Sequence, residues 1–179
     1  MGEEAPVLST RERGKVAADR VQEALDQGSV VISFKAVEVA TPSFLDEVVR
    51  RLGGLLRGNE ERVVVITETN EDVADSLELV LEKHKMALAT VKGKQLELLG
   101  GSTQLKSTLA AAQQMHGFSA ADLAKELEVK LPNLHQRLKG LMEAGAVSRA
   151  TDESATRGTR HRYETAQTKI KAGTITLTN

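Results

Sequence analysis

The sequence predicts a chain of α/β class in two parts, on three observations. First, two short continuous apolar runs, VVISF at 30–34 and VVVIT at 63–67, alternate with segments of helical apolar spacing. Such uninterrupted runs are typical of strands covered on both faces. Second, Gly100 and Gly101 interrupt this pattern. Third, the stretch after the two glycines places helical segments before a hairpin pattern, which indicates a smaller α+β part.

The first part, residues 1–99, is expected to place helices around the two buried strands. A helix beginning near residue 11 ends at Gly28, and the stretch FLDEVVRRLGGLL at 44–56 repeats apolar residues at i, i+3, i+4 and i+7. Asn70 can cap a third helix. The segments MALATV and QLELL, on either side of a KGK turn, then predict a hairpin.

The second part, residues 103–165, is expected to hold three helices and a β-hairpin. The first helix covers STQLKSTLAAAQQM, and Ser119 followed by Asp122 is a start signal for the second. The third, LPNLHQRLKGLMEAG, aligns its apolar residues on one face and ends at Gly145. AVSRAT and RHRYET form the predicted hairpin, and residues 166–179 are expected to add a strand or a hairpin.

Composition narrows the classes of protein. Apolar residues make up 40% of the 179 residues but aromatic residues only 2%, so the core must be aliphatic. The chain has no cysteine, which excludes disulfides, thiolate metal sites and thiol nucleophiles and fits a reducing cytoplasm. No apolar run approaches the roughly 20 residues of a membrane span, and the polar, acidic first ten residues do not resemble a signal peptide. We therefore expect a cytoplasmic protein without a membrane partner.

Charge is distributed unevenly along the chain. Residues 1–101 hold 13 basic and 18 acidic side chains, whereas residues 102–165 hold nine basic and seven acidic ones. The acidic first part is poorly suited to nucleic acid, while the second part could bind it through local placement of its cations.

No catalytic or metal-binding motif is present. The four histidines are scattered without ligand spacing, and the Gly-Lys pairs lack the frame of a phosphate-binding loop. We expect no enzyme activity, no metal and no cofactor.

The stretch SAADLAKELEVKLPNLHQRLKGLMEAGAVSR, 119–149, resembles a bacterial winged helix-turn-helix transcription factor, and the resemblance extends over about 103–165. It implies that Ala124 lets two helices approach closely and that Leu134 and Leu138 hold the recognition helix on the core. It also implies double-stranded DNA as the partner, with the N-terminal part of that helix in the major groove.

The candidate DNA-binding residues follow from the helical spacing. With the leucines turned inward, polar side chains of the recognition helix face outward or flank the core, and amide side chains there suit adenine edges. Arginines around Gly158 suit phosphate or minor-groove contacts. The complete candidate set is Lys130, Asn133, His135, Gln136, Lys139, Arg157, Arg160 and Arg162. Solvated side chains without a nucleic-acid role are the plainer interpretation of the same pattern.

The segments VVISFKAVEVATPSFLDEVVRRL and VVVITETNEDVADSLELVL resemble STAS-like domains, relatives of the anti-sigma-factor antagonists. The resemblance covers residues 8–99 and implies a small sheet covered by helices that acts through protein contacts. In the true antagonists a serine at this helix start is phosphorylated. The equivalent position here is Pro42, so Ser43 and Thr41 are the neighbouring candidates. Alternatively, Thr41 or Ser43 simply caps the helix.

Together these features predict a prokaryotic DNA-binding transcriptional regulator. The STAS-like domain would mediate homodimerisation or bind a protein partner, and the winged helix would bind DNA. The alternative is a protein-interaction adaptor or a STAS-type phosphoswitch in which neither domain binds DNA.

Overall fold

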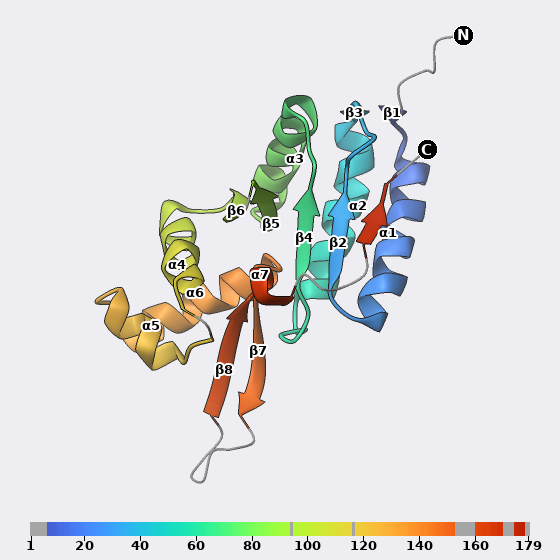
Figure 1. Ribbon diagram of the computed structural model, residues 1–179. Helices are drawn as coiled ribbons and strands as arrows, with labels where there is room; N and C mark the ends of the chain where they lie inside the picture. The colour runs from blue at the N-terminus through green and yellow to red at the C-terminus, as the bar shows by residue number, and fades with distance from the viewer. Residues whose placement is uncertain (1–6, 94, 116, 153–159, 170–173, 178–179) are drawn as a thin grey trace.

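The computed structural model describes residues 7–93, 95–115, 117–152, 160–169 and 174–177, and the chain is of α/β class, as predicted. Its centre is a five-stranded sheet in the order β6-β5-β4-β2-β9 (Figure 1). The strands are β2 (Val30–Ser33), β4 (Val64–Thr67), β5 (Ala87–Lys92), β6 (Gln95–Gly100) and β9 (Thr174–Thr176). Only β6 runs antiparallel to its neighbour within this sheet, as the predicted hairpin with β5 requires.

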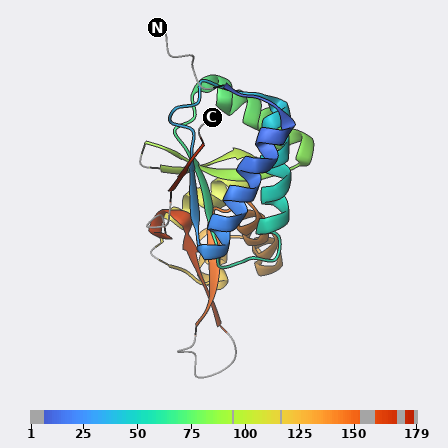
Figure 2. The ribbon, with the colours of Figure 1, turned by 90° about the vertical axis from the view of Figure 1, so that its right-hand side faces the viewer.

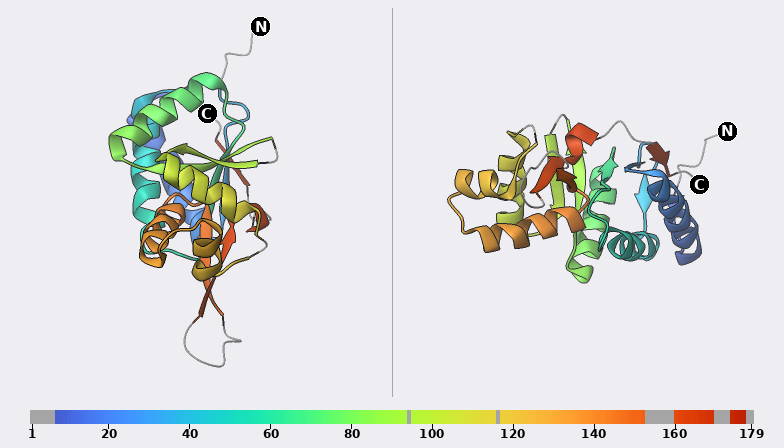
Figure 3. Two further views of the ribbon diagram at one scale, coloured as in Figure 1. Left: turned by 90° about the vertical axis from the view of Figure 1, so that its left-hand side faces the viewer. Right: turned by 90° about the horizontal axis from the view of Figure 1, so that it is seen from below.

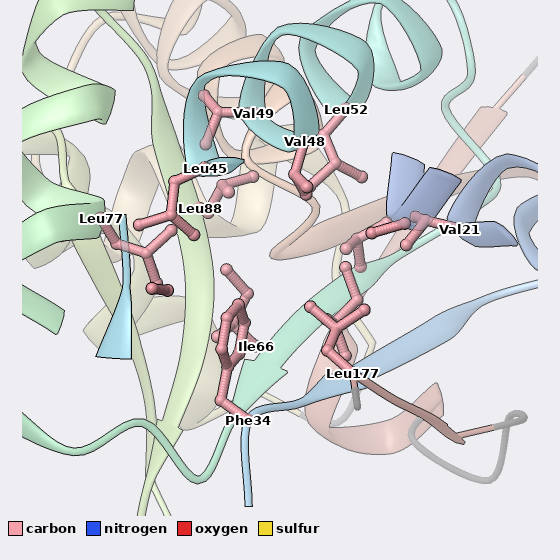
Figure 4. Packing of buried hydrophobic residues seen from close by; sticks show 14 of the residues in the cluster. Val21, Phe34, Leu45, Val48, Val49, Leu52, Ile66, Leu77, Leu88 and Leu177 are labelled. Atoms are coloured by element: carbon pink, nitrogen blue, oxygen red, sulfur yellow. The ribbon is translucent and has the colours of Figure 1, made fainter. Parts of the chain in front are cut away.

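Three helices cover one face of the sheet. They are α1 (Arg11–Gln27), α2 (Pro42–Leu56) and α3 (Glu71–His84), and each was predicted. Alternate strand residues, among them Ile66 and Leu88, meet Leu45, Val49 and Leu77 of these helices (Figure 4). Because successive strand residues point to opposite faces, the remaining residues of the same strands face the other way.

The other face of the sheet packs on the second part of the chain. This part comprises α4 (Thr103–Gln113), α5 (Ala120–Glu126), α6 (Leu131–Glu143), the antiparallel strands β7 (Val147–Asp152) and β8 (Arg160–Thr165), and α7 (Ala166–Lys169). Val65 and Ala89 of the sheet, with Val63 just before β4, join Leu109 and Leu141 in one hydrophobic cluster. Residues on both sides of Gly100–Gly101 therefore share a core, and α4–α6 lie together beside the sheet (Figure 3).

Backbone hydrogen bonds fasten the end of α6 to the strands. Val64 N donates to Gly145 O at 3.2 Å, and Ala89 N donates to Ala144 O at 2.9 Å. A further contact pairs the Arg149 side chain with Glu60. Since unpaired backbone groups are costly when buried, these bonds set the position of α6 relative to the sheet.

The segment after the hairpin returns to the first part of the chain. Strand β9 pairs in parallel with β2, with Ile32 opposite Ile175, and Leu177 N donates to Ser33 O at 3.0 Å. Leu177 is buried in the cluster under α1 and α2. Figure 2 shows the dark red β9 beside β2, to the left of α1 in this view. The tail predicted as a strand or hairpin thus supplies an edge strand of the main sheet.

Three short elements were not predicted, namely helix α7, where a strand or hairpin was expected, and two short strands. Strands β1 (Val7–Leu8) and β3 (Val39–Ala40) form a separate parallel pair, because Leu8 and Ala40 are buried at the start of α2. Among the described helices, none combines the length and apolar character needed to cross a membrane.

Gly145 should be intolerant of a side chain. Its φ is +70°, and an added Cβ would lie 2.6 Å from Val64 O. We expect Gly145→Ala to lower the free energy of unfolding by about 2–4 kcal/mol, because backbone strain and a clash with the strand add together. Gly58→Ala is the matched control: its φ is +80°, but no atom lies within 4 Å of an added Cβ. The control should cost about 1 kcal/mol. Equal losses in urea unfolding would contradict a close approach at Gly145.

Candidate nucleic-acid interface

Helices α5 and α6 are joined by the turn 127–130, and local hydrogen bonds fix where each begins. Asp122 N donates to Ser119 Oγ and Ser119 N donates to Asp122 Oδ2, each at 3.2 Å, which is the reciprocal cap that the sequence predicts. Hydrogen bonds from the Ser119 hydroxyl and backbone lower the pKa of the Asp122 carboxyl. Glu128 turns the chain with φ 52°, and Lys130 precedes α6 without a side-chain cap.

One face of α6 is buried, as predicted. Leu134, Leu138 and Leu141 are at most 1% exposed, and they pack with Leu123 and Ala124 of α5. Burial of this face holds the opposite face toward solvent.

The outward face of α6 carries the predicted candidates Lys130, Asn133, His135, Gln136 and Lys139, all of them exposed. Residues 129–142 include three basic side chains and no acidic one. Lys139 Nζ lies 4.0 Å from Glu143 Oε1 one turn later, a distance that gives a weak, solvent-screened ion pair. The exposed face of α6 is therefore polar and locally positive.

Two of these candidates face a cleft between α6 and the start of α4. The cleft has a volume of about 410 Å³ and is lined by Ser102, Gln104, Leu105, Asn133, Gln136 and Arg137. Sequence analysis missed Arg137, whose Nη1 lies 3.4 Å from Thr108 Oγ1. Its position four residues after Asn133 could have indicated it, because i and i+4 share a helix face. The α4 residues could not be identified in this way, since only the packing of α4 against α6 brings them near.

The hairpin places one predicted arginine beside the start of α5. Phe118 and Tyr163 stack with ring centroids 5.7 Å apart and exchange two backbone hydrogen bonds. The guanidinium of Arg162 consequently lies over Gly117, where an added Cβ would be 2.7 Å from its Nε. Arg162 is exposed. Arg157 lies outside the described residues, and for Arg160 the structure describes the backbone but not the side chain.

Helix α3 has the opposite character to α6. Its acidic residues are Glu71, Asp72, Asp75, Glu78 and Glu82, all of them exposed. Three of these residues border a hollow of about 910 Å³ between α3 and the second part of the chain. The described surface thus separates an acidic helix from the polar face of α6.

At the start of α2, the structure distinguishes the two candidate hydroxyls. Thr41 is the cap, because Phe44 N donates to its Oγ1 at 3.4 Å, and Pro42 is the first helical residue. Ser43 is exposed and lines a hollow of about 270 Å³ together with Arg11 and Lys83. Of the two predicted caps, only Thr41 has the capping geometry.

Asp46 and Glu47 lie beyond the first turn of α2, and side-chain hydrogen bonds rather than the helix dipole act on their carboxyl groups. Asp46 Oδ1 accepts hydrogen bonds from Lys83 Nζ and His84 Nε2, each at 2.7 Å, and these bonds lower the pKa of Asp46. The hydrogen bond from Arg50 likewise lowers the pKa of Glu47. Asp46 therefore ties α2 to the C-terminal end of α3.

Within the described ranges, no three His, Asp or Glu side chains converge so that they could hold a metal ion. Comparisons with protein-family models, with curated proteins and with solved structures give no significant match.

Asp46 should make stability depend on acidic pH. Its folded pKa is lowered from the ordinary value of 3.8, so its contribution is present above that pH and is lost as pH falls through the folded value. We expect Asp46→Asn to lower the free energy of unfolding at pH 7 by about 1–3 kcal/mol. The difference from the parent should shrink toward pH 3 in urea titrations. A difference that stays constant with pH would contradict this role.

The two hydroxyls at the start of α2 should differ in their effect on stability. Thr41→Ala should lower the free energy of unfolding by about 0.5–2 kcal/mol, because it removes the cap from Phe44 N. Ser43→Ala is the neighbouring control and should change it by less than about 0.5 kcal/mol, since exposed positions without such a role tolerate substitution. Thermal and urea unfolding measure both effects, and a larger loss for Ser43→Ala would reverse the assignment.

Proposed function

We propose that the chain is a DNA-binding transcriptional regulator of a prokaryotic cytoplasm. In this proposal α4–α6 and β7–β8 act as a winged helix-turn-helix, and the α/β part acts as a STAS-like domain for homodimerisation or partner binding. The observation that carries the proposal is the exposed face of α6, where Asn133, Gln136 and Lys139 point outward and no acidic residue occurs between 129 and 142. The N-terminal part of a recognition helix presents such side chains to base edges in the major groove.

The surroundings of α6 fit the same role. Lys130 stands at the N-terminal end of the helix, where it can contact a phosphate beside the groove. Arg162 lies on the hairpin next to the start of α5, so it can supply a second contact to the phosphate backbone of DNA. Contacts of this kind position a protein on the duplex, while the amides Asn133 and Gln136 are suited to sequence discrimination.

Self-association would make DNA binding more effective. One recognition helix supplies few base contacts, and two copies on neighbouring half-sites multiply them. The α/β part is suited to this role because its acidic α3 would be repelled by DNA, whereas it can contact protein.

A protein-interaction adaptor is the second candidate, and Ser43 is the observation that favours it. The exposed Ser43 shares its hollow with Arg11 and Lys83, which pair with Glu47 and Asp46 and could also contact a phosphorylated side chain. In an adaptor of this kind, phosphorylation would control protein binding, and no duplex would be bound.

Substitutions at the start of α6 and on its exposed face should distinguish side chains that contact DNA phosphates from side chains that recognise bases. We expect Lys130→Ala and Lys139→Ala to weaken binding to all duplexes and each to reduce the slope of log affinity against log salt by about 0.9. Asn133→Ala and Gln136→Ala should leave this slope unchanged and relax base preference by about 1–3 kcal/mol at the contacted base. Fluorescence anisotropy with duplexes selected from a random pool measures both effects.

Lys92→Ala, on the β5–β6 hairpin, is the control for loss of one exposed positive charge. It should leave affinity and slope unchanged. If the unsubstituted protein binds no duplex at low salt, the regulator is excluded and the adaptor becomes the better account.

A further inference from the structure

The two most exposed large apolar side chains that the structure describes lie on α1 and α3. Val16 and Leu79 are each 61% exposed. These helices flank α2 on the same face of the sheet, with α1 at one end of the helical layer and α3 at the other (Figure 1). Leu79 lines a hollow together with Arg11 of α1 and Ser43 of α2, whereas Val16 lines a separate hollow.

Val16 borders an apolar hollow with a positive rim. The hollow has a volume of about 290 Å³, and its apolar lining comes from Leu8, Val16, Ala17, Phe44 and Leu177. Arg13 and Arg20 also line it, one on either side of Val16 along α1. This face of α1 therefore combines an apolar centre with two cations.

Leu79 is flanked by acidic side chains along α3, and the cations Lys83 and Arg11 line the hollow on the side of Leu79 that faces α2. Asp75 precedes it by one turn and Glu82 follows it by nearly one turn, and both acidic residues are exposed. This face of α3 therefore combines an apolar centre with two anions. It is the electrostatic complement of the α1 face.

The spacing of the two faces also matches. Arg13 and Arg20 are seven residues apart, as are Asp75 and Glu82, and each interval spans about 10 Å of helix at 1.5 Å per residue. When α1 of one chain and α3 of another run antiparallel, a single register brings the two charged pairs and the apolar pair together. It places Arg20 opposite Asp75, Val16 opposite Leu79, and Arg13 opposite Glu82.

We propose that the Arg13–Val16–Arg20 face of α1 binds the Asp75–Leu79–Glu82 face of α3 in a second copy of this chain. In this contact Leu79 enters the hollow beside Val16, and the flanking charges form intermolecular ion pairs. One turn beyond them, Glu23 and Asp72 would face each other, so the helices must cross at an angle that separates their ends.

Pairing like with like is disfavoured by charge. An α1–α1 contact would bring the arginines of two copies together, and an α3–α3 contact would do the same with the carboxylates. The α1–α3 contact is head-to-tail, so it leaves a free α1 at one end of a pair and a free α3 at the other. Such an interface continues into larger assemblies unless the rotation between copies closes a ring.

The inference rests on the proposed self-association of the α/β part but not on DNA binding. A charge exchange in the full-length chain, measured by sedimentation velocity without DNA, tests it. Arg20→Glu alone brings two carboxylates together at this contact, and Asp75→Arg alone brings two guanidinium groups together. We expect each variant to raise the dissociation constant for self-association at least about tenfold.

Restored complementarity is the specific signature of this interface. An equimolar mixture of the two variants pairs the introduced carboxylate with the introduced guanidinium in one contact and retains Arg20 with Asp75 in the other. The mixture and the double variant should both return to within about threefold of the parent. Lys92→Glu and Glu97→Arg carry the same charge changes on the exposed β5–β6 hairpin and should leave the dissociation constant unchanged.

Three results would overturn the inference. They are a parent that stays monomeric at the highest attainable concentration, single variants that associate like the parent, and single variants that weaken association but are not rescued by mixing. In the last two cases the chain still self-associates through another surface, so the proposed regulator would stand. Far-ultraviolet circular dichroism of each variant shows that its fold is retained.

Discussion

Burial of both faces of β4 is the constraint on which the rest of the structure depends. Val64 and Ile66 face the helices of the first part, while Val65 and the preceding Val63 face the second part. A strand without a polar face must be covered on both sides, because exposing either side would return apolar surface to water. The helices of the first part cover only one face of the sheet, and the second part of the chain covers the other face.

This shared core limits how α6 can move. Its C-terminal end is bonded to β4 and β5 through Gly145 and Ala144, while its N-terminal end, with Lys130, stands exposed. The C-terminal end of α6 is thus held against the sheet, and its polar N-terminal end lies in solvent.

Acidic and basic side chains are also distributed differently on the two sides of the sheet. The described part of the chain places its acidic helix α3 on one side of the sheet and the locally positive α6 on the other. Ion pairs to the buried Asp46 hold α3 against α2 without using the outward carboxylates of α3. These carboxylates thus remain at the surface and give this side of the molecule a negative charge.

The sequence by itself determined most of the helices and strands, because apolar periodicity, glycine stops and capping residues act locally. The spacing of Leu134, Leu138 and Leu141 was sufficient to predict which side chains of α6 face outward, and Asn70 and Ser119 marked two helix starts correctly. The choice between Thr41 and Ser43 as the cap needed coordinates, since both fit the same local rule.

Only the tertiary structure decided the contacts between segments that are distant in the chain. Pairing of β9 with β2, the shared cluster across Gly100–Gly101 and the cleft between α4 and α6 join residues up to about 140 positions apart. No local pattern carries this information, because a short strand such as β9 does not specify its neighbour in the sheet. The partners of Asp46 could not be predicted from the sequence for the same reason, because Lys83 and His84 reach it only when α3 packs against α2.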